Sequence, residues 1–213
     1  MTNSVGKGAL ATILQSAVCR TRVKHRPAPS LFYFPGLSSK AVWDSKQFPW
    51  AAELENNYDV ILKEYHQLRS KHPGSDYVTQ EEHKLHAGRW DWNSYIVKGK
   101  RQTDFAVHCP KTVDFLESIK SPALMTGTPF SFAFFSTLFP NSSIAAHYGP
   151  CNLRVRCHFP LIVPTKDANI GMTVGDEQVK WEAGKAVFFD DCYEHKVWNE
   201  TAEERVLLLF DVW

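Results

Sequence analysis

This sequence of 213 residues lacks a long apolar run and an excess of either charge. A helix that crosses a bilayer needs about 20 consecutive apolar residues, and no stretch approaches that length. The formal net charge is +1, which gives no general electrostatic reason to bind nucleic acid or a membrane. P-loop, dinucleotide-binding and nucleophile-elbow motifs are also absent. We therefore expect no membrane span in this chain and no nucleic-acid partner.

Cysteines are few, and their pattern excludes two common structural roles. The number is odd, and the spacing fits neither a disulfide framework nor a zinc ribbon. The five positions are Cys19, Cys109, Cys151, Cys157 and Cys192. Free thiols are typical of a reducing compartment, so the sequence predicts a cytoplasmic protein.

Acidic residues are missing from the first 43 positions, whereas Lys and Arg recur there from Lys7 to Lys40. An apolar run at 9–18 lies between Lys7 and Arg20. Residues 1–29 are therefore either a basic arm packed on the domain or a mitochondrial targeting segment, which would be basic and poor in acids. We expect residues 30–213 to form a single domain.

Helices and early strands are predicted in the first two thirds of the chain. An aromatic strand at 32–37 should end at the Pro35-Gly36 turn. A helix should begin near Pro49, because apolar residues repeat at helical spacing up to 68, and end at 72–74. Alternation predicts a strand at 90–97, and a second helix is expected at 110–119.

After Pro129 the sequence changes to short β-type runs separated by turn residues. The expected strands are 130–137, 143–147, 153–163, 170–174, 178–181, 186–189, 196–198 and 205–212. Many short strands with close turns favour a sandwich or barrel, with a jelly roll among the options. The sequence thus predicts a mainly β protein with its core at about 130–213 and helices packed on it.

His147 and His195 each lie beside a turn at the end of a predicted strand. They are too far apart for a helical pair but could meet on two strands of a barrel. Imidazole binds iron, copper, zinc and nickel alike, so the ligand type does not choose the metal. A single histidine is more often a hydrogen-bonded structural group, and both interpretations stay open on the residues alone.

Arg154, Arg156 and His158 share one parity in a predicted strand, so they should lie on one face. The opposite face is apolar. The basic face is therefore either solvated or part of a cavity. Burying two guanidinium groups without anions is very unfavourable, so a bound carboxylate ligand would offset the cost inside a cavity.

Arg205 and an aspartate pair have one structural and one functional interpretation each. Arg205 precedes a strongly apolar strand, where it is either a charge at the strand start or an anion-binding group. Asp190 and Asp191 end another apolar strand, where they either orient His195 or a metal-bound water, or form a simple turn.

Two further groups are assigned no chemistry. His83 and His86 lie in a charged segment, which favours a solvated surface over a metal pair. Cys151 and Cys192 flank the two histidine motifs, but no general base is placed beside either. We interpret them as small buried residues.

The ordered motifs resemble those of the aspartyl/asparaginyl β-hydroxylase family, in its short branch that has the catalytic domain only. The motifs are His147-x-Gly-Pro-x-Asn, Arg154-x-Arg156-x-His158, Trp181-x-x-Gly184, Phe-Asp-Asp-x-x-Glu-His195-x-Val-Trp-Asn, Arg205 and Asp211-Val-Trp. The resemblance is close over 130–213 and extends to 32–37 and 48–50. It implies a double-stranded β-helix, a jelly-roll fold shared with cupins.

The resemblance also implies the roles of the site residues. His147 and His195 would bind Fe(II), and Gly149 stands where the usual facial triad has a carboxylate, which this family lacks. Arg205 would pair with the distal carboxylate of 2-oxoglutarate, to which Ser136 would also hydrogen-bond.

The remaining polar residues receive looser assignments from the resemblance. Arg156 and His158 would lie near the 1-carboxylate of 2-oxoglutarate or near the substrate. Arg154 would face an acidic group of the substrate, and Asp191 would act on the metal from outside its ligand shell.

The implied activity is hydroxylation of an aspartyl or asparaginyl side chain, in a peptide or protein, with Fe(II), 2-oxoglutarate and O2, and with ascorbate as a reductant. Three alternatives stay open. They are a β-barrel module that binds metal and 2-oxoglutarate without turnover, an oxygenase of a small molecule, and another cupin-type metal enzyme.

Overall fold

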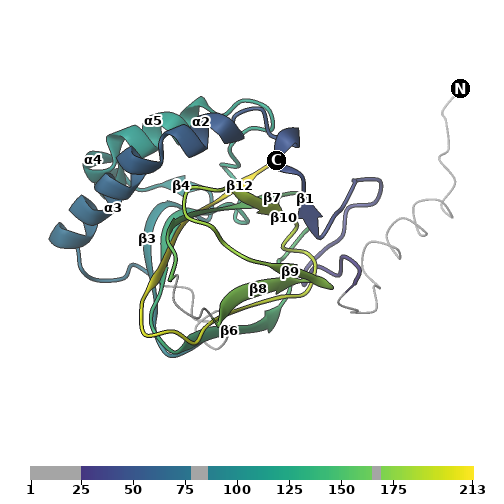
Figure 1. Ribbon diagram of the computed structural model, residues 1–213. Helices are drawn as coiled ribbons and strands as arrows, with labels where there is room; N and C mark the ends of the chain where they lie inside the picture. The colour runs from purple at the N-terminus through teal and green to yellow at the C-terminus, as the bar shows by residue number, and fades with distance from the viewer. Residues whose placement is uncertain (1–24, 78–85, 165–168) are drawn as a thin grey trace, which may run out of the picture.

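The computed structural model describes residues 25–77, 86–164 and 169–213, in which two antiparallel sheets face each other and helices cover one of them (Figure 1). The helices are η1 (Ser45–Gln47), α2 (Ala51–Asn56), α3 (Tyr58–Lys71), α4 (Thr103–His108) and α5 (Pro110–Ser118). The strands are β1 (Val42–Trp43), β2 (His86–Ala87), β3 (Trp90–Val97), β4 (Lys100–Arg101), β5 (Ala133–Leu138), β6 (Ser142–His147), β7 (Val155–Ile162), β8 (Ile170–Val174), β9 (Glu177–Val179), β10 (Val187–Phe189), β11 (His195–Asn199) and β12 (Arg205–Val212). No helix within the described ranges has the length and apolar character needed to cross a membrane.

The path of the chain between the sheets defines a double-stranded β-helix. The larger sheet has the order β1-β10-β7-β12-β5-β3-β4, and the smaller sheet has the order β2-β6-β11-β8-β9. From β5 to β12 the chain crosses repeatedly from one sheet to the other, so that β5, β7, β10 and β12 of the larger sheet alternate with strands of the smaller one. The expected mainly β, jelly-roll fold is confirmed.

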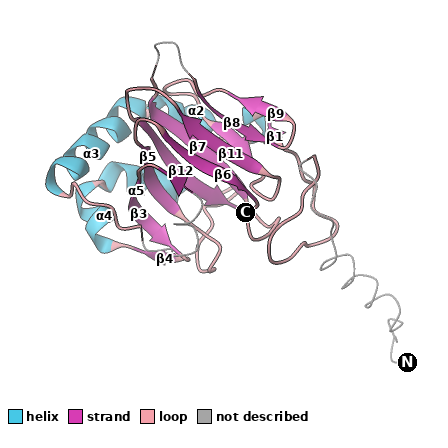
Figure 2. Ribbon diagram, turned by 90° about the horizontal axis from the view of Figure 1, so that it is seen from below, coloured by secondary structure: helices cyan, strands magenta, loops and turns pink. Residues whose placement is uncertain are grey.

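Helices pack on the outer face of the larger sheet, and Figure 2 shows them grouped on one side of the strands. Both faces of β12 are consequently buried. Side chains alternate between the faces of a strand, so its even-numbered residues join the core under the helices and its odd-numbered residues point between the sheets. The first group is Val206, Leu208, Phe210 and Val212; the second is Arg205, Leu207, Leu209 and Asp211.

The predicted parity of β7 is confirmed in the same way. Cys157 and Phe159 belong to the core under the helices. Arg156 and His158 therefore point into the space between the two sheets. The basic face is part of the interior of the β-helix and not an ordinary solvated face.

The expected aromatic strand at 32–37 is wrong, although its Pro35-Gly36 turn is present, with Gly36 at a φ of 89°. The backbone of this segment bonds to a loop instead of a strand. Phe32 N–H donates to the Pro150 carbonyl, and Phe34 N–H donates to the Asn152 side chain at 2.7 Å. Aromatic content favours a strand, but ladder formation requires a partner that this segment does not have.

Other departures from the sequence prediction are local. The helix expected from Pro49 is divided at Asn57 into α2 and α3, and α4 was not predicted. The expected arm at 1–29 lies mostly outside the described residues. At its end Ala28 is buried and donates its N–H to the Cys192 carbonyl at 2.8 Å.

A buried carboxylate joins two of the covering helices. Glu64 of α3 is only 6% exposed, and it accepts hydrogen bonds from the N–H groups of Lys111 and Thr112 in the first turn of α5. The Thr112 hydroxyl donates to the same carboxylate at 2.7 Å. The first N–H groups of a helix have no intrahelical acceptor, and a carboxylate there also interacts favourably with the helix dipole. Glu64 thus caps a helix other than its own.

We predict that Glu64→Ala lowers the free energy of unfolding by roughly 1–3 kcal/mol, because it leaves buried donors without an acceptor. Urea denaturation of the parent and the variant measures the difference. Glu53→Ala, at an exposed position of α2, is the matched control and should change stability by less than about 0.5 kcal/mol. Equal effects of the two substitutions would contradict the capping role.

Candidate active site between the sheets

Two histidines face each other at one end of the smaller sheet. His147 is the last residue of β6, His195 is the first of β11, and the two are direct cross-strand partners. Their ring centroids lie 4.0 Å apart. The sequence prediction that these histidines meet on two strands is confirmed.

Each imidazole is oriented by a nearby backbone carbonyl. Nδ1 of His147 lies 2.7 Å from the Ala145 carbonyl oxygen, and Nδ1 of His195 lies 3.0 Å from that of Tyr193. A carbonyl only accepts, so Nδ1 carries the hydrogen in a neutral ring and Nε2 keeps its lone pair. Burial lowers the pKa of both imidazoles, which favours the neutral form. This is the form in which histidine binds a transition metal.

A third protein ligand is not available beside the histidine pair. Within the described ranges, no group of three or more His, Cys, Asp or Glu side chains is arranged to hold a metal ion. Gly149 is packed against Asp191, and a Cβ atom at Gly149 would lie 2.5 Å from both carboxylate oxygens. The space next to Gly149 is thus filled by the Asp191 carboxylate, which explains why no side chain fits at this position.

Two arginines and two aspartates form a buried ion-pair cluster, Arg154, Arg156, Asp191 and Asp211. Arg154 donates to both carboxylate oxygens of Asp191, to Asp211 at 3.2 Å and to the Phe130 carbonyl. Arg156 donates to the two oxygens of Asp211 at 2.8 and 3.1 Å, and its Nη1 lies 3.4 Å from Asp191. Only the Arg156 side chain keeps appreciable exposure, at 14%.

The two aspartates supply the negative charge that, from the sequence alone, a bound carboxylate ligand would provide. A bound ligand is not needed to offset the burial of Arg154 and Arg156, because Asp191 and Asp211 do so. Burial opposes ionisation of Asp191, yet Arg154 and Arg156 together hold the pKa of its carboxyl below the ordinary value. From the sequence, Asp211 is identified only as part of the Asp211-Val-Trp motif and has no assigned role. Its position on the same face of β12 as Arg205 was the signal that could have identified it.

Asp190 points to a different part of the molecule from Asp191. It accepts hydrogen bonds from Trp43 Nε1 at 2.7 Å and from Lys40 N–H at 3.0 Å. Burial raises the pKa of its carboxyl to about 7. Asp190 therefore anchors the segment before β1, and only Asp191 of the pair belongs to the site.

Arg205 is a buried cation whose charge is not balanced. It is 1% exposed, and within the described ranges no carboxylate forms an ion pair with it. Nη1 donates to the carbonyl and hydroxyl oxygens of Ser136, both at 3.2 Å, and Nε has no hydrogen-bond partner. The guanidinium carbon lies 4.9 Å from the Trp181 ring centroid. Burial lowers the pKa of Arg205 to about 9. An anionic ligand here would remove a large electrostatic cost.

His158 lies between these charged groups as a neutral ring. Its Nδ1 is buried without a hydrogen-bond partner, and its ring packs 4.8 Å from that of Phe189. Burial, with Arg205 and Arg156 nearby, puts its pKa well below the ordinary value. An unpartnered buried nitrogen next to an unbalanced cation indicates a place where a polar ligand binds.

An open cavity of about 390 Å³ leads to the histidine end of the site. His147, Arg154, Arg156 and Asp191 contribute its charged and imidazole lining. Its aromatic lining, which we call the aromatic wall, consists of Trp90, Trp92, Phe130, Phe132 and Phe134. Arg205, Ser136 and His158 do not line the cavity. Trp90 connects the two regions, because it lines the cavity and donates through Nε1 to Ser136 Oγ at 2.9 Å.

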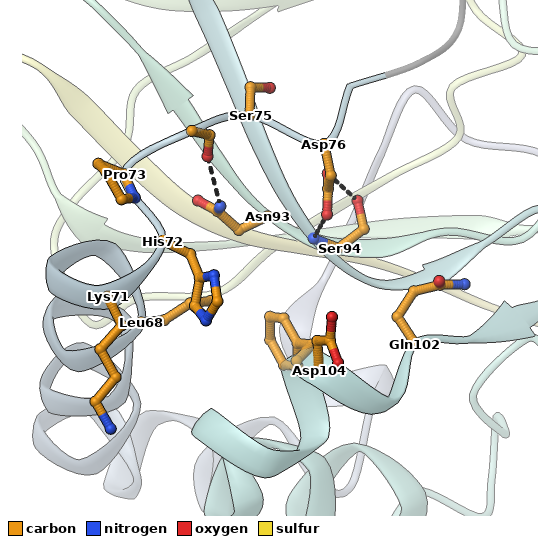
Figure 3. Close-up of a pocket in the computed structure, with 12 residues that line it drawn as sticks. Leu68, Lys71, His72, Pro73, Ser75, Asp76, Asn93, Ser94, Gln102 and Asp104 are labelled. Carbon is orange, nitrogen blue, oxygen red and sulfur yellow. Dashed lines mark hydrogen bonds between the residues drawn. The ribbon is translucent and has the colours of Figure 1, made fainter.

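A larger hollow of about 500 Å³ lies between the end of α3, β3 and the start of α4 (Figure 3). None of the candidate site residues predicted from the sequence lines it. Polar groups on its β3 side have partners within the protein. Asp76 accepts hydrogen bonds from Ser94 N–H at 2.6 Å and its hydroxyl at 2.8 Å, and Asn93 donates to the Gly74 carbonyl. Since these groups are satisfied within the protein, we place the candidate site in the cavity beside His147.

Cys151 and Cys192 are buried, as expected, whereas the solvated surface expected around His86 is not found, because its ring is partly buried against aromatic side chains. Cys151 and Cys192 are buried free thiols, and burial raises the pKa of both. His83 lies outside the described residues. His86 packs with its ring centroid 6.3 Å from that of Trp90.

We predict that Asp191→Asn lowers the free energy of unfolding at pH 7 by roughly 3–5 kcal/mol, because it leaves buried arginine charge unbalanced. The folded state lowers the pKa of Asp191. Its contribution is therefore present above the ordinary Asp pKa of about 4 and lost as the pH falls below it. Parent and variant should thus differ less at pH 3 than at pH 7 in urea titrations. Asp114→Asn, at an exposed position of α5, is the control, and an equal loss in the control would rule out the cluster as the cause.

Comparisons with known proteins agree with the fold. In the solved 2OG-Fe(II) oxygenase-family oxidoreductase of Burkholderia pseudomallei, the matching region covers 91% of this chain and 95% of that chain, with a TM-score of 0.50 and 10% identity. Ornithine lipid ester-linked acyl 2-hydroxylase of Rhizobium tropici is 32% identical over 82% of this chain and 61% of its own length. Human aspartyl/asparaginyl beta-hydroxylase is 28% identical over 86% of this chain.

The chain spans about three fifths of the Rhizobium protein and about a quarter (24%) of the human one. The model of the family described as Aspartyl/Asparaginyl beta-hydroxylase matches residues 55–213, which include every candidate site residue. Since this match covers most of the sequence, the protein belongs to the aspartyl/asparaginyl beta-hydroxylase family.

Proposed function

We propose that this protein is an Fe(II)- and 2-oxoglutarate-dependent hydroxylase that acts on a carbon next to a carbonyl group. The observation that carries the proposal is the unbalanced buried cation Arg205, in the same interior as the His147–His195 pair. A dicarboxylate satisfies both features, because one end can pair with the guanidinium while the other reaches the metal.

The two histidines fit a metal that must keep several positions open. His147 and His195 would hold Fe(II) through Nε2, while the backbone carbonyls hold each ring in place. When bound, Fe(II), 2-oxoglutarate and O2 supply the oxidation: 2-oxoglutarate loses CO2 and gains one oxygen atom as succinate, and the other oxygen atom converts a substrate C–H into C–OH. Ascorbate would act only as an added reductant.

The chain's own residues would bind and orient 2-oxoglutarate. Arg205 would pair with its distal carboxylate, with the Ser136 hydroxyl as a second donor. His158 lies on the interior face of β7 and would meet the end nearer the metal. Nδ1 of His158, Nε of Arg205 and Nε1 of Trp181, whose ring packs against both residues, are buried atoms in this region without a hydrogen-bond partner.

The ion-pair cluster would act on the metal and the substrate by position. Asp191, held against Gly149 by Arg154, would not be a ligand but would accept a hydrogen bond from a metal-bound water or orient His195. Arg154 lines the cavity, but its hydrogen bonds are largely taken up by Asp191, Asp211 and Phe130. We therefore propose that Arg154 serves the substrate mainly by fixing Asp191, and that the more exposed Arg156 contacts the substrate carbonyl.

The substrates named for the two relatives share one type of bond. The β-carbon of an aspartyl or asparaginyl residue is next to the side-chain carbonyl, and carbon 2 of an acyl chain is next to the ester carbonyl. The human relative and the family resemblance favour an aspartyl or asparaginyl side chain, and the Rhizobium relative supports an ester-linked acyl chain. Hydroxylation next to a carbonyl is the chemistry common to both.

We predict that the parent protein converts 2-oxoglutarate to succinate with Fe(II) and ascorbate under air, and that His147→Ala and His195→Ala each reduce the rate at least about 100-fold. His66→Ala, at an exposed position of α3, is the control and should match the parent. Succinate is quantified with aspartyl peptides and with acyl esters. A parent that binds metal and 2-oxoglutarate but forms no succinate with either substrate would instead be a binding module.

We predict that Arg205→Met raises the free energy of unfolding of the ligand-free protein by about 1–4 kcal/mol, because it removes a buried unbalanced charge from a space of similar volume. The same substitution should abolish stabilisation by 2-oxoglutarate. At 100 times Kd the ligand should stabilise the parent by about 2.7 kcal/mol. Thermal and urea unfolding with and without 2-oxoglutarate measure both effects.

Arg101→Met is the matched control, since Arg101 is half-exposed and paired with Glu117. It should keep the response to 2-oxoglutarate. Loss of that response in Arg101→Met, or its retention in Arg205→Met, would remove Arg205 from the ligand site.

A further inference from the structure

Exposed apolar side chains are concentrated on one short segment that leads into β1 and ends at its first residue. Within the described ranges seven large apolar residues are exposed, and four of them lie between positions 31 and 42. We call these four the apolar rim: Leu31 (66% exposed), Phe34 (55%), Leu37 (42%) and Val42 (36%). The segment runs outside the two sheets on its way to β1, where Figure 1 draws it in purple. Clustered exposed apolar groups are typical of an interaction surface.

The exposure of the apolar rim is built into the fold. Leu31 N–H donates to the Pro150 carbonyl at 3.1 Å. Asn152 accepts from Phe34 N–H at 2.7 Å and donates to the Phe34 carbonyl at 2.9 Å. The Phe32 ring packs edge-on against Phe130, with centroids 5.4 Å apart. These contacts hold the backbone in place while the side chains of Phe34 and Leu37 point to solvent.

The apolar rim is continuous with the cavity of the candidate site. Ser30 and Leu31 line that cavity together with His147 and the aromatic wall. Ser30 N–H donates to the Gly149 carbonyl at 2.8 Å, next to the histidine pair. An apolar chain bound at the rim would thus find an apolar path toward the candidate metal site.

Cationic side chains accompany the apolar rim. Between His25 and Trp43 the sequence has no Asp or Glu, and Arg26 and Lys40 are both exposed. Lys98, which also lines the cavity, is exposed in the turn between β3 and β4. Exposed apolar side chains on a segment with Arg and Lys but no Asp or Glu fit an anionic lipid surface. There Lys and Arg are attracted to the headgroups, and apolar side chains enter the interface.

The charge of the site agrees with an uncharged reacting group. Arg154 and Arg156 are already balanced by Asp191 and Asp211, so the cavity offers little free positive charge to a substrate carboxylate. An ester carbonyl carries no charge and requires only a hydrogen-bond donor. The aromatic wall provides an apolar surface for the chain beyond that carbonyl.

We propose that the apolar rim docks on an anionic phospholipid surface and that the cavity receives an ester-linked acyl chain from it, with carbon 2 as the hydroxylated position. The substrate half of this proposal rests on the hydroxylase function proposed above. The docking half does not depend on catalysis.

Co-sedimentation with vesicles tests docking without metal or turnover. The chain of 213 residues is mixed with vesicles of phosphatidylcholine alone or with 30% phosphatidylglycerol (about one lipid in three, enough for an anionic surface). The parent should bind the anionic vesicles more strongly. Phe34→Ser/Leu37→Ser should reduce the partition constant about tenfold or more, because two inserting apolar side chains are lost.

The matched control is Val60→Ser/Val107→Ser, which replaces two exposed apolar residues of α3 and α4 (41% and 72% exposed). It should bind like the parent. A parent that ignores anionic vesicles, or a rim variant that binds as well as the parent, overturns the proposal. A parent that self-associates through the rim and does not bind vesicles would make the rim a contact between copies of this chain, which also overturns it.

Succinate assays separate the two halves of the proposal. On vesicles that contain an ester-linked lipid, the rim variant should turn over about tenfold more slowly than the parent, whereas a short water-soluble acyl ester should be used equally by both. Turnover with aspartyl peptides and none with either ester would overturn the substrate half. Vesicle binding that depends on the rim, with no succinate from any substrate, would leave docking standing and reject the hydroxylase function.

Discussion

The buried ion-pair cluster is the constraint on which the site depends. Arg154 and Arg156 come from the start of β7, Asp191 follows β10, and Asp211 lies near the end of β12, so the cluster joins three separate parts of the chain. Removing one member of a buried charge group is costly because the others lose their compensation. The loop after β6 carries Gly149, which packs against Asp191. This contact fixes the position of the loop and of His147 at the end of β6.

The start of β12 has the opposite charge balance from its end. On the interior face of β12, Asp211 completes a balanced cluster, whereas Arg205 has no anion. A dicarboxylate that entered the cluster would have to displace an aspartate, but at Arg205 it would neutralise a charge that the fold leaves uncompensated. The distribution of counterions therefore makes the Arg205 end the favourable place for an anionic ligand.

Period-two alternation made much of this arrangement predictable from the sequence. Alternation placed Arg156 and His158 on one face of a strand, which the sequence allowed to be either solvated or internal, and turns beside strand ends allowed His147 and His195 to meet. Alternation could have placed Asp211 on the interior face of its strand, but it could not place either aspartate beside the arginines, because Asp191 and Asp211 approach them only through the pairing of distant strands. The strand expected at 32–37 failed for a related reason, since its partner is a loop and local composition contains no information on what a segment will bond to.

Charge, more than size, separates the substrates that this cavity could accept. An aspartate side chain would bring a third carboxylate to two arginines that Asp191 and Asp211 already share, and it would leave water to do so. An amide or ester carbonyl avoids both costs and accepts a hydrogen bond from a single donor such as Arg156. Of these two, only the acyl ester also has a use for the aromatic wall and for the exposed Phe34 and Leu37 at its margin. The balanced cluster and the apolar rim, which lie in different parts of the fold, thus favour the same class of substrate.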